Sequence, residues 1–312
     1  MFAGIALKIL AAFFFTLMAA CIRWIGDAVP PGQVVFFRSF LGLLPIVVWL
    51  ILVGELKQTV LTRNIPGHFL RSFIGCLSML FVFSGLARLP LPDATVIGYA
   101  APLITIVLAY FILKERIGIY RWSAVGVGLI GVLILLWPHL SGGTLAEAFG
   151  GVGGEARVSQ GALFALAGAF CSACAMIQVR RLAQTEKAGA IVFYFSLFSA
   201  VLSFLSIPFG WVMPDLTVMG VLLLTGIFGG IGQLLMTQSY RYADASLIAV
   251  FEYTTIIWSV ALGWALFGDV PQSTVYIGAA IIIGSGVYVI FREHRLGIKR
   301  ARARKASAPP ST

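Results

Sequence analysis

Long apolar runs recur along the whole chain and are separated by short polar connections. A helix needs about 20 predominantly apolar residues to span the hydrocarbon core of a bilayer, and these runs reach that length. The pattern therefore predicts an all-α integral membrane protein with ten transmembrane helices. We expect them at residues 4–25, 33–53, 68–87, 93–113, 120–137, 160–179, 189–209, 216–238, 245–267 and 273–291.

One polar, glycine-rich stretch, residues 138–159, lies between the fifth and the sixth apolar run. It contains GGVGG, but no strand-like run precedes this motif and no Lys-Ser or Lys-Thr closes it. We therefore interpret the stretch as a flexible linker rather than a phosphate-binding loop. The linker divides the chain into a first five-helix unit, residues 4–137, and a second, residues 160–291. Residues 292–312 form a basic tail that ends in Ala, Pro and Ser, and we expect it to be disordered near anionic lipid head groups.

The two predicted units share a sequence pattern around their last two helices. Because each unit holds five helices, an odd number, the second unit has to enter the membrane from the opposite side. Such an inverted repeat is typical of carriers, in which the two units rock about a site near the midplane of the bilayer. The corresponding positions are Arg88 and Arg241, Asp93 and Asp244, Ala94 and Ala245, Tyr99 and Tyr253, Glu115 and Asp269, and Gly131 and Gly286.

Charge is scarce and unevenly placed along the chain. Hydrophobic residues make up 60% of the 312 residues and charged residues 11%, with a mean hydropathy of +0.98, whereas about a quarter of a soluble domain is charged. The formal charge of +10 does not indicate a nucleic-acid partner, because seven of the 22 Lys and Arg lie after Phe291 and most others lie in short connections. Cytoplasmic loops carry an excess of Lys and Arg, which predicts that both termini are cytoplasmic, in the cell (inner) membrane. The side with the excess holds Lys57, Arg63, Arg71, Lys114, Arg116, Arg121, Arg180, Arg181, Lys187 and Arg241, and the other side keeps Arg23, Arg88 and Arg157.

The first apolar run also resembles a signal peptide, since Lys8 precedes an apolar stretch that reaches Cys21. The stretch continues into Ile22 and Trp24 without polar sequence, and it has a counterpart in the second half. We therefore interpret it as the first transmembrane helix rather than as a cleaved signal.

The sequence holds no constellation of catalytic residues or metal ligands. The three histidines lie at or beyond the ends of the expected helices, and neither H-E-x-x-H nor G-x-S-x-G occurs. Cys171 and Cys174 form a C-x-x-C without a second pair, which favours packing of small residues over a redox or metal site. A membrane-embedded enzyme is therefore disfavoured against a carrier, and we expect no cofactor. The histidines are His68, His139 and His294.

Several short motifs together resemble the drug/metabolite transporter superfamily, and within it the EamA type. Members of this family often have Gly-Glu where this chain has Lys114-Glu115 and Gly268-Asp269. The resemblance implies ten helices in two repeated units and transport of a small organic solute. The motifs are FFRS at Phe36–Ser39, YAAP ending at Pro102, LKER at Leu113–Arg116, RYADAS at Arg241–Ser246, FEYTTIIW at Phe251–Trp258 and LFGD at Leu266–Asp269.

Within this family the sequence is most similar to a branch that includes riboflavin importers and S-adenosylmethionine carriers. The resemblance implies riboflavin uptake as the leading function. Transport of S-adenosylmethionine or of an amino acid is the alternative, and export stays open beside import.

Glu252 is the leading candidate for a functional side chain, because it lies about seven residues, or roughly 10 Å, inside the expected helix 245–267. An ionisable residue inside the membrane normally faces a cavity or a partner. Burial would favour the protonated form of Glu252, so a proton could accompany the cargo. The structural alternative is a neutral, hydrogen-bonded Glu or an ion pair with Arg241.

Arg38 lies a turn or two inside the expected helix 33–53. Its guanidinium group could bind a carboxylate or phosphate of the cargo. Extension of the side chain to the membrane surface explains its position equally well.

Aromatic and amide side chains of three expected helices could form the walls of a pocket for a flat solute. Trp and Tyr also populate membrane interfaces, which is the alternative for about half of them. Pro102 should interrupt its helix and could act in gating, although kinks without function also occur. Glycines in 120–137 and 273–291 favour close helix packing. The wall candidates are Tyr99, Tyr110, Gln233, Gln238, Tyr253 and Trp258, and the packing glycines are Gly126, Gly128, Gly131, Gly278, Gly284 and Gly286.

Overall fold

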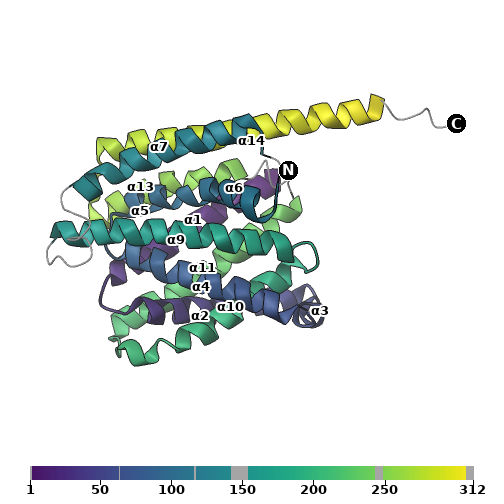
Figure 1. The fold of residues 1–312 in the computed structure, drawn as a ribbon. Helices are drawn as coiled ribbons and strands as arrows, with labels where there is room; N and C mark the ends of the chain where they lie inside the picture. The colour runs from purple at the N-terminus through teal and green to yellow at the C-terminus, as the bar shows by residue number, and fades with distance from the viewer. Residues whose placement is uncertain (1, 63, 116, 142–153, 243–248, 307–312) are drawn as a thin grey trace.

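The computed structural model describes residues 2–62, 64–115, 117–141, 154–242 and 249–306 (Figure 1). Over these residues the secondary structure is helical and no strand is present. The helices are α1 (Phe2–Ile25), α2 (Pro31–Leu52), α3 (Leu56–Val60), α4 (Ile65–Leu86), α5 (Leu91–Gly98), α6 (Ala100–Ile112), α7 (Ile119–Ser141), α9 (Gly154–Leu182), α10 (Ala188–Phe204), the 3₁₀ helix η1 (Ile207–Phe209), α11 (Leu216–Tyr242), the 3₁₀ helix η2 (Ala249–Thr254), α13 (Thr255–Phe267) and α14 (Ser273–Ala306).

Seven helical segments of the described chain are long and apolar enough to cross a membrane, and three shorter apolar helices accompany them. Helix α2 illustrates the surface that lipid would cover, since Phe40, Leu44 and Val48 are 53%, 60% and 53% exposed. These residues recur at every fourth position and form one stripe, whereas Ser39 and Gly42 of the same helix are buried. The protein is therefore all-helical over the described residues, with several membrane-spanning segments.

Two of the expected helices are not continuous α-helix: one is interrupted in its first half, and the other begins as a 3₁₀ helix. The range predicted as one helix, 93–113, is divided into α5 and α6 at Tyr99. Pro102 explains this break, because proline has no N–H to donate to the carbonyl four residues earlier. It lies in the first turn of α6, where N–H groups have no partner within the helix. In the second half, η2 precedes α13, and residues 243–248 lie outside the described chain.

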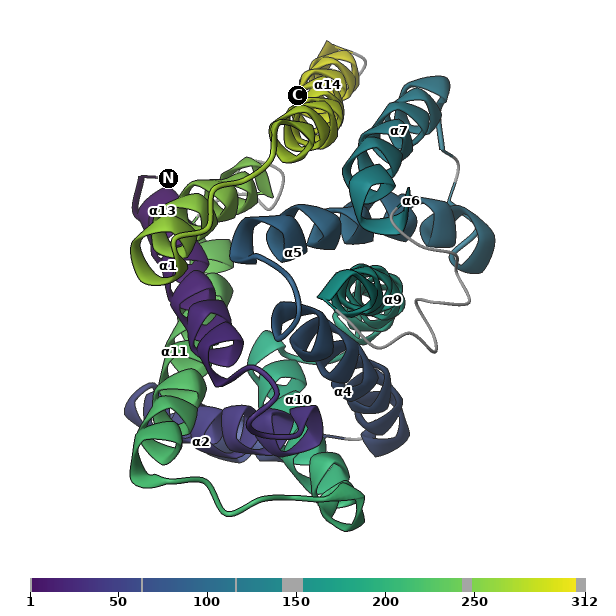
Figure 2. The same cartoon turned by 90° about the vertical axis from the view of Figure 1, so that its left-hand side faces the viewer.

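Helices from the two halves of the chain alternate in the packing. Helix α1 packs along α11, and α4 packs along α9. Each of these two pairs combines one helix from the first half of the chain with one helix from the second half. Figure 2 shows the first pair on one side of the bundle and the second pair on the other. Helix α7 lies beside α14 at one edge and α2 beside α10 at the opposite edge (Figures 1 and 2). The core therefore lies largely between the two halves of the chain.

Glycines let α7 and α14 approach closely. A Cβ at Gly278 would lie 2.9 Å from the carbonyl oxygen of Gly131, and a Cβ at Gly131 would lie 2.9 Å from Ile282. Close packing is confirmed at these two positions. The same expectation is wrong for Gly126 and Gly284, where a Cβ would meet no atom within 4 Å, because both face away from the bundle.

Helix α14 is longer than the apolar pattern predicts. Residues 292–306 are helical where disorder was expected, and the end of the helix projects beyond the other helices in Figure 1. Lys, Arg and Ala all favour helix, so the basic segment continues the apolar helix. The expected linker 138–159 is likewise helical at both ends, since α7 ends at Ser141 and α9 begins at Gly154.

Replacing Gly278 with Ala should destabilise the protein, because the new methyl group would meet the backbone of Gly131 and push α7 and α14 apart. Overpacking costs about 1–3 kcal/mol, so the Tm measured in detergent should fall by several degrees. Gly284→Ala is the matched control on the same helix. It should keep or raise the Tm, since Ala favours helix over Gly by about 1 kcal/mol. Equal Tm values for the two variants would contradict the close contact.

Candidate functional site

Tyr99 and Tyr253, the tyrosines at the two helix breaks, lie against each other. Their ring centroids are 5.2 Å apart, with an angle of 71° between the rings. The Tyr99 hydroxyl donates a long hydrogen bond of 3.4 Å to the carbonyl oxygen of Tyr253. Gly286 of α14 leaves room for this pair, since a Cβ there would lie 1.8 Å from the Tyr253 hydroxyl. Two predicted site residues from opposite halves of the chain are thus in contact.

Glu252 forms an ion pair with Lys8 of α1. The Lys8 side chain is 3% exposed and the Glu252 side chain 51% exposed, so the ammonium group is buried while the carboxylate keeps an open side. This partner differs from the expected Arg241, whose side chain lies outside the described part of the chain. In the sequence, Lys8 stands out only as the residue that precedes an apolar stretch. Because 244 positions separate the two residues, no local pattern connects them.

Trp258 faces α1, and Gln233 lies on α11, which packs along α1. The centroid of the Trp258 ring is 5.1 Å from that of Phe13, and its indole Nε1 is buried without a hydrogen-bond partner. Gln233 is half-buried next to Gly232, where a Cβ would lie 3.1 Å from the Phe15 ring. A buried N–H without a partner is a donor that a ligand can satisfy.

Arg38 is buried among helices rather than extended to the membrane surface. It is 6% exposed, and its guanidinium carbon lies 5.4 Å from the centre of the Phe195 ring in α10. The guanidinium carbon of Arg71 lies 3.6 Å from the centre of the same ring. The charge pattern assigns Arg71 to the cytoplasmic side, inside the expected helix 68–87, and α4 begins three residues earlier, at Ile65. The side chain of Asn64 caps this helix start.

The predicted site residues fall into two groups, one around Glu252 and one around Arg38. Among the described residues, no hydrogen bond, ion pair or ring contact joins Arg38 to Glu252, to the tyrosine pair or to Trp258. Tyr110 belongs to neither group. It is 43% exposed and packs against Trp122, which agrees with an interfacial position.

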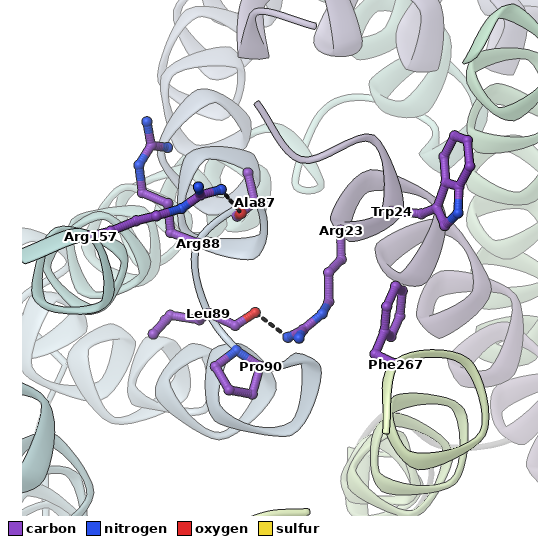
Figure 3. A pocket seen from close by; sticks show the side chains of 8 residues that line it. All are labelled: Arg23, Trp24, Ala87, Arg88, Leu89, Pro90, Arg157 and Phe267. Atoms are coloured by element: carbon purple, nitrogen blue, oxygen red, sulfur yellow. Dashed lines mark hydrogen bonds between the residues drawn. The ribbon is translucent and has the colours of Figure 1, made fainter. Parts of the chain in front are cut away.

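A pocket of about 420 Å³ opens where the ends of α1, α4, α9 and α13 meet (Figure 3). It contains Arg23, Arg88 and Arg157, the three arginines that the charge count leaves on the non-cytoplasmic side. Arg23 pairs with Asp269 at 2.7 Å, and Arg88 and Arg157 pair with Asp27 at 3.5 Å and 2.8 Å. None of the predicted site residues lines this pocket, and its ion pairs connect helix ends. The remaining lining residues are Trp24, Ala87, Leu89, Pro90 and Phe267.

The EamA-like transporter family model matches residues 2–137 and residues 159–292, which is most of the chain. The chain belongs to this family. The match spans both halves and includes the residues around both helix breaks.

Curated relatives of this EamA-like transporter are themselves named as transporters. A pseudopaline exporter of Pseudomonas aeruginosa is 27% identical over 284 residues, which cover 90% of this chain and 93% of the relative. An S-adenosylmethionine uptake transporter of Rickettsia bellii is 27% identical over 278 residues, or 89% of this chain and 90% of the relative. A solved crystal structure covers 94% of this chain and 98% of its own with a TM-score of 0.65. At 22% identity this last likeness is evidence for the fold alone.

These findings define the class of the protein. This EamA-like transporter is a multi-pass membrane protein, and both its family and its named relatives are transporters rather than enzymes. The resemblance to the drug/metabolite transporter superfamily is thereby confirmed.

Lys8→Gln should destabilise this EamA-like transporter, because it removes the counter-charge of Glu252, and Glu252→Gln should do the same to the buried ammonium group. If the two side chains stabilise each other, the double variant should lose less than the sum of the single variants, with a coupling of roughly 0.5–3 kcal/mol. Thermal unfolding of the four proteins in detergent measures this coupling. Strictly additive losses would be incompatible with the ion pair.

Proposed function

We propose that this EamA-like transporter is a secondary carrier of the inner membrane that moves a small organic metabolite by alternating access. The observation that carries the proposal is the contact between Tyr99 and Tyr253, since each lies at a break in an apolar helix. Helix breaks inside a membrane free backbone groups, and in carriers such breaks occur at the substrate site. The proposed site therefore lies where the two breaks meet.

The fold proposed for this carrier has ten transmembrane helices in two inverted units, residues 4–137 and 160–291. The packing supports it, because an exchange of the two units converts the α1–α11 pair into the α9–α4 pair and leaves the α7–α14 and α2–α10 pairs unchanged. Residues on the axis of such an exchange should contact their own counterparts, as Tyr99 and Tyr253 do. In this arrangement both termini are cytoplasmic and the three-arginine pocket opens to the other side.

S-adenosylmethionine replaces riboflavin as the first cargo to test. Named relatives take up S-adenosylmethionine or export pseudopaline, and neither name supports riboflavin. S-adenosylmethionine combines a flat adenine ring, a sulfonium cation and an amino-acid group. The rings of Tyr99, Tyr253 and Trp258 suit the adenine and the cation, Gln233 offers an amide, and the open side of Glu252 suits a positive charge. Another amino-acid-derived solute is the alternative cargo.

Ion pairs near both ends of α1 suit a carrier that opens alternately to each side. Lys8 and Glu252 connect α1 to η2, and Arg23 and Asp269 connect the other end of α1 to the residues after α13. Opening of the Lys8–Glu252 pair would free both side chains, and coupling of transport to protons through this pair is part of the proposal. Pro102 beside the break at Tyr99 provides the hinge in the first unit.

Gly286→Ala should reduce transport, because the new methyl group would occupy the position of the Tyr253 hydroxyl and displace that ring from Tyr99. Loss of one well-placed aromatic contact is worth about 0.5–1.5 kcal/mol, or about two- to tenfold in affinity. The assay follows labelled S-adenosylmethionine into and out of proteoliposomes. Gly284→Ala, two positions away in open space, is the matched control and should transport as the wild type does.

This assay tests the identity of the cargo and the position of the site independently. Transport by the wild type that Gly286→Ala leaves intact would contradict the site at the tyrosine pair. If the wild type does not move S-adenosylmethionine, that cargo is excluded, and the same liposomes then test amino acids. Transport by the wild type and by Glu252→Gln is also compared with and without an imposed proton gradient. If transport is coupled to protons through Glu252, the gradient should stimulate transport by the wild type and not by the variant.

Fusions of bacterial alkaline phosphatase, which is active only outside the cytoplasm, test the inverted arrangement. Five membrane crossings precede the linker, so a fusion after residue 150 should be active, and a fusion after residue 306 should be inactive. The expected contrast is large, because the enzyme does not mature in the cytoplasm. Activity at both positions, or the reverse pattern, would contradict the two inverted five-helix units.

A further inference from the structure

We propose that Arg38, Arg71 and Phe195 form a binding site for a carboxylate group of the cargo, apart from the tyrosine pair. The three residues come from α2, α4 and α10. Both guanidinium carbons approach one aromatic ring, at 5.4 Å for Arg38 and 3.6 Å for Arg71. The inference rests on the proposed function for the origin of the anion, since the cargo would bring it.

All three residues lie well inside their helices. Each is six or seven residues beyond the first residue of its helix, which is about 9–10 Å along the helix axis at 1.5 Å per residue. The hydrocarbon core is about 30 Å thick, so residues at this distance from the helix start fall in the apolar interior where the helix begins near the membrane surface. Ionisable side chains at this depth are costly and mark the pathways of substrates or ions.

The two guanidinium groups lack a counter-charge among the described residues. Neither forms an ion pair or a hydrogen bond with another described residue, and Nε of Arg38 and Nε and Nη1 of Arg71 are buried without a partner. One turn earlier in α4, His68 lies 3.6 Å from Glu186, and that carboxylate accepts a hydrogen bond of 2.8 Å from the Thr62 hydroxyl, so it has a partner of its own. Arg38 is buried and Arg71 is partly buried, and two unpaired cations in such surroundings repel each other and are costly. An anion bound between them would remove both penalties.

Glycines shape the space around the two guanidinium groups. A Cβ at Gly75 would lie 2.5 Å from Nη1 of Arg71 and 2.7 Å from the Phe195 ring, and a Cβ at Gly229 would lie 3.3 Å from Nε of Arg38. Each arginine is therefore held between a glycine backbone and the aromatic ring. Donors fixed in this way bind an anion with little loss of side-chain freedom.

The second half of the chain has a phenylalanine at the position of Arg38. The segments VVFFRSF, from Val34, and IVFYFSL, from Ile191, align position by position, so that Arg38 corresponds to Phe195. An aromatic side chain satisfies helix packing at this position without any charge. The charge on Arg38 is therefore not required by the fold.

A carboxylate supplies the two arginines with the negative charge and the hydrogen-bond acceptors that the Phe195 ring lacks. A guanidinium group offers parallel N–H donors at the spacing of two carboxylate oxygens. The contact with Phe195 attracts the cations through the face of the ring, but it supplies no negative charge. A single carboxylate between Arg38 and Arg71 would accept hydrogen bonds from both.

The experiment compares the Tm of the purified full-length protein in detergent with sodium malonate and with sodium chloride at equal ionic strength. Malonate is a small dicarboxylate, and an anion that binds only the folded state raises the Tm. We expect malonate to raise the Tm of the wild type by about 2–4 °C more than that of Arg38→Gln or Arg71→Gln. Arg181→Gln removes an exposed arginine and should retain the full response.

A second pair of variants keeps all charges. Gly75→Ala displaces the guanidinium of Arg71 and should lose the response, whereas Gly126→Ala makes the same change in open space and should keep it. Each variant is compared with itself in chloride, so a less stable variant still gives a reading. No rise in the wild type, or an equal rise in the wild type, Arg71→Gln and Gly75→Ala, would overturn the proposal. The measurement requires no transport, so its failure and that of the transport assay are distinguishable.

Discussion

Hydrocarbon offers no partner to a charge or to a free backbone group, so each such group needs one inside the bundle or on a bound solute. Lys8 meets Glu252, Arg23 meets Asp269, and the helix breaks at Tyr99 and before α13 face each other. In each case the partner comes from the other half of the chain. Helices α4 and α9 also meet through polar groups, since the Ser78 and Ser172 hydroxyls lie 2.6 Å apart.

The class of fold is readable from the sequence because lipid selects for long apolar runs, and these runs set the helices. Pro102 also predicts the break in the first half, since a missing N–H acts on the nearest turn. No such residue precedes Thr255, and the 3₁₀ segment before α13 has no sequence signal that we recognise. The helix from residue 292 to 306 was missed for a different reason. Composition measures whether a segment can form a core, whereas a basic helix that continues an existing one needs no core.

The sequence identifies individual residues of the site but not which of them contact each other. Glu252 and Arg38 stand out because a charge in an apolar run is rare, and Tyr99 and Tyr253 because the two halves repeat. Their partners are set by tertiary packing between distant segments. Arg71 illustrates the limit, since it lies inside the expected helix 68–87, yet no sequence pattern shows that its guanidinium group meets the Phe195 ring of another helix.

The interleaving of the halves also affects how the protein is made. Lys8, Arg38 and Arg71 belong to the first half, while Glu252 and Phe195 belong to the second. A ribosome delivers the first half to the membrane while these partners are still unsynthesised. During that interval three cationic side chains have to be kept by the insertion machinery or by lipid head groups, and the first half cannot complete its own interior. These contacts can therefore form only after the segments that carry Phe195 and Glu252 have been synthesised.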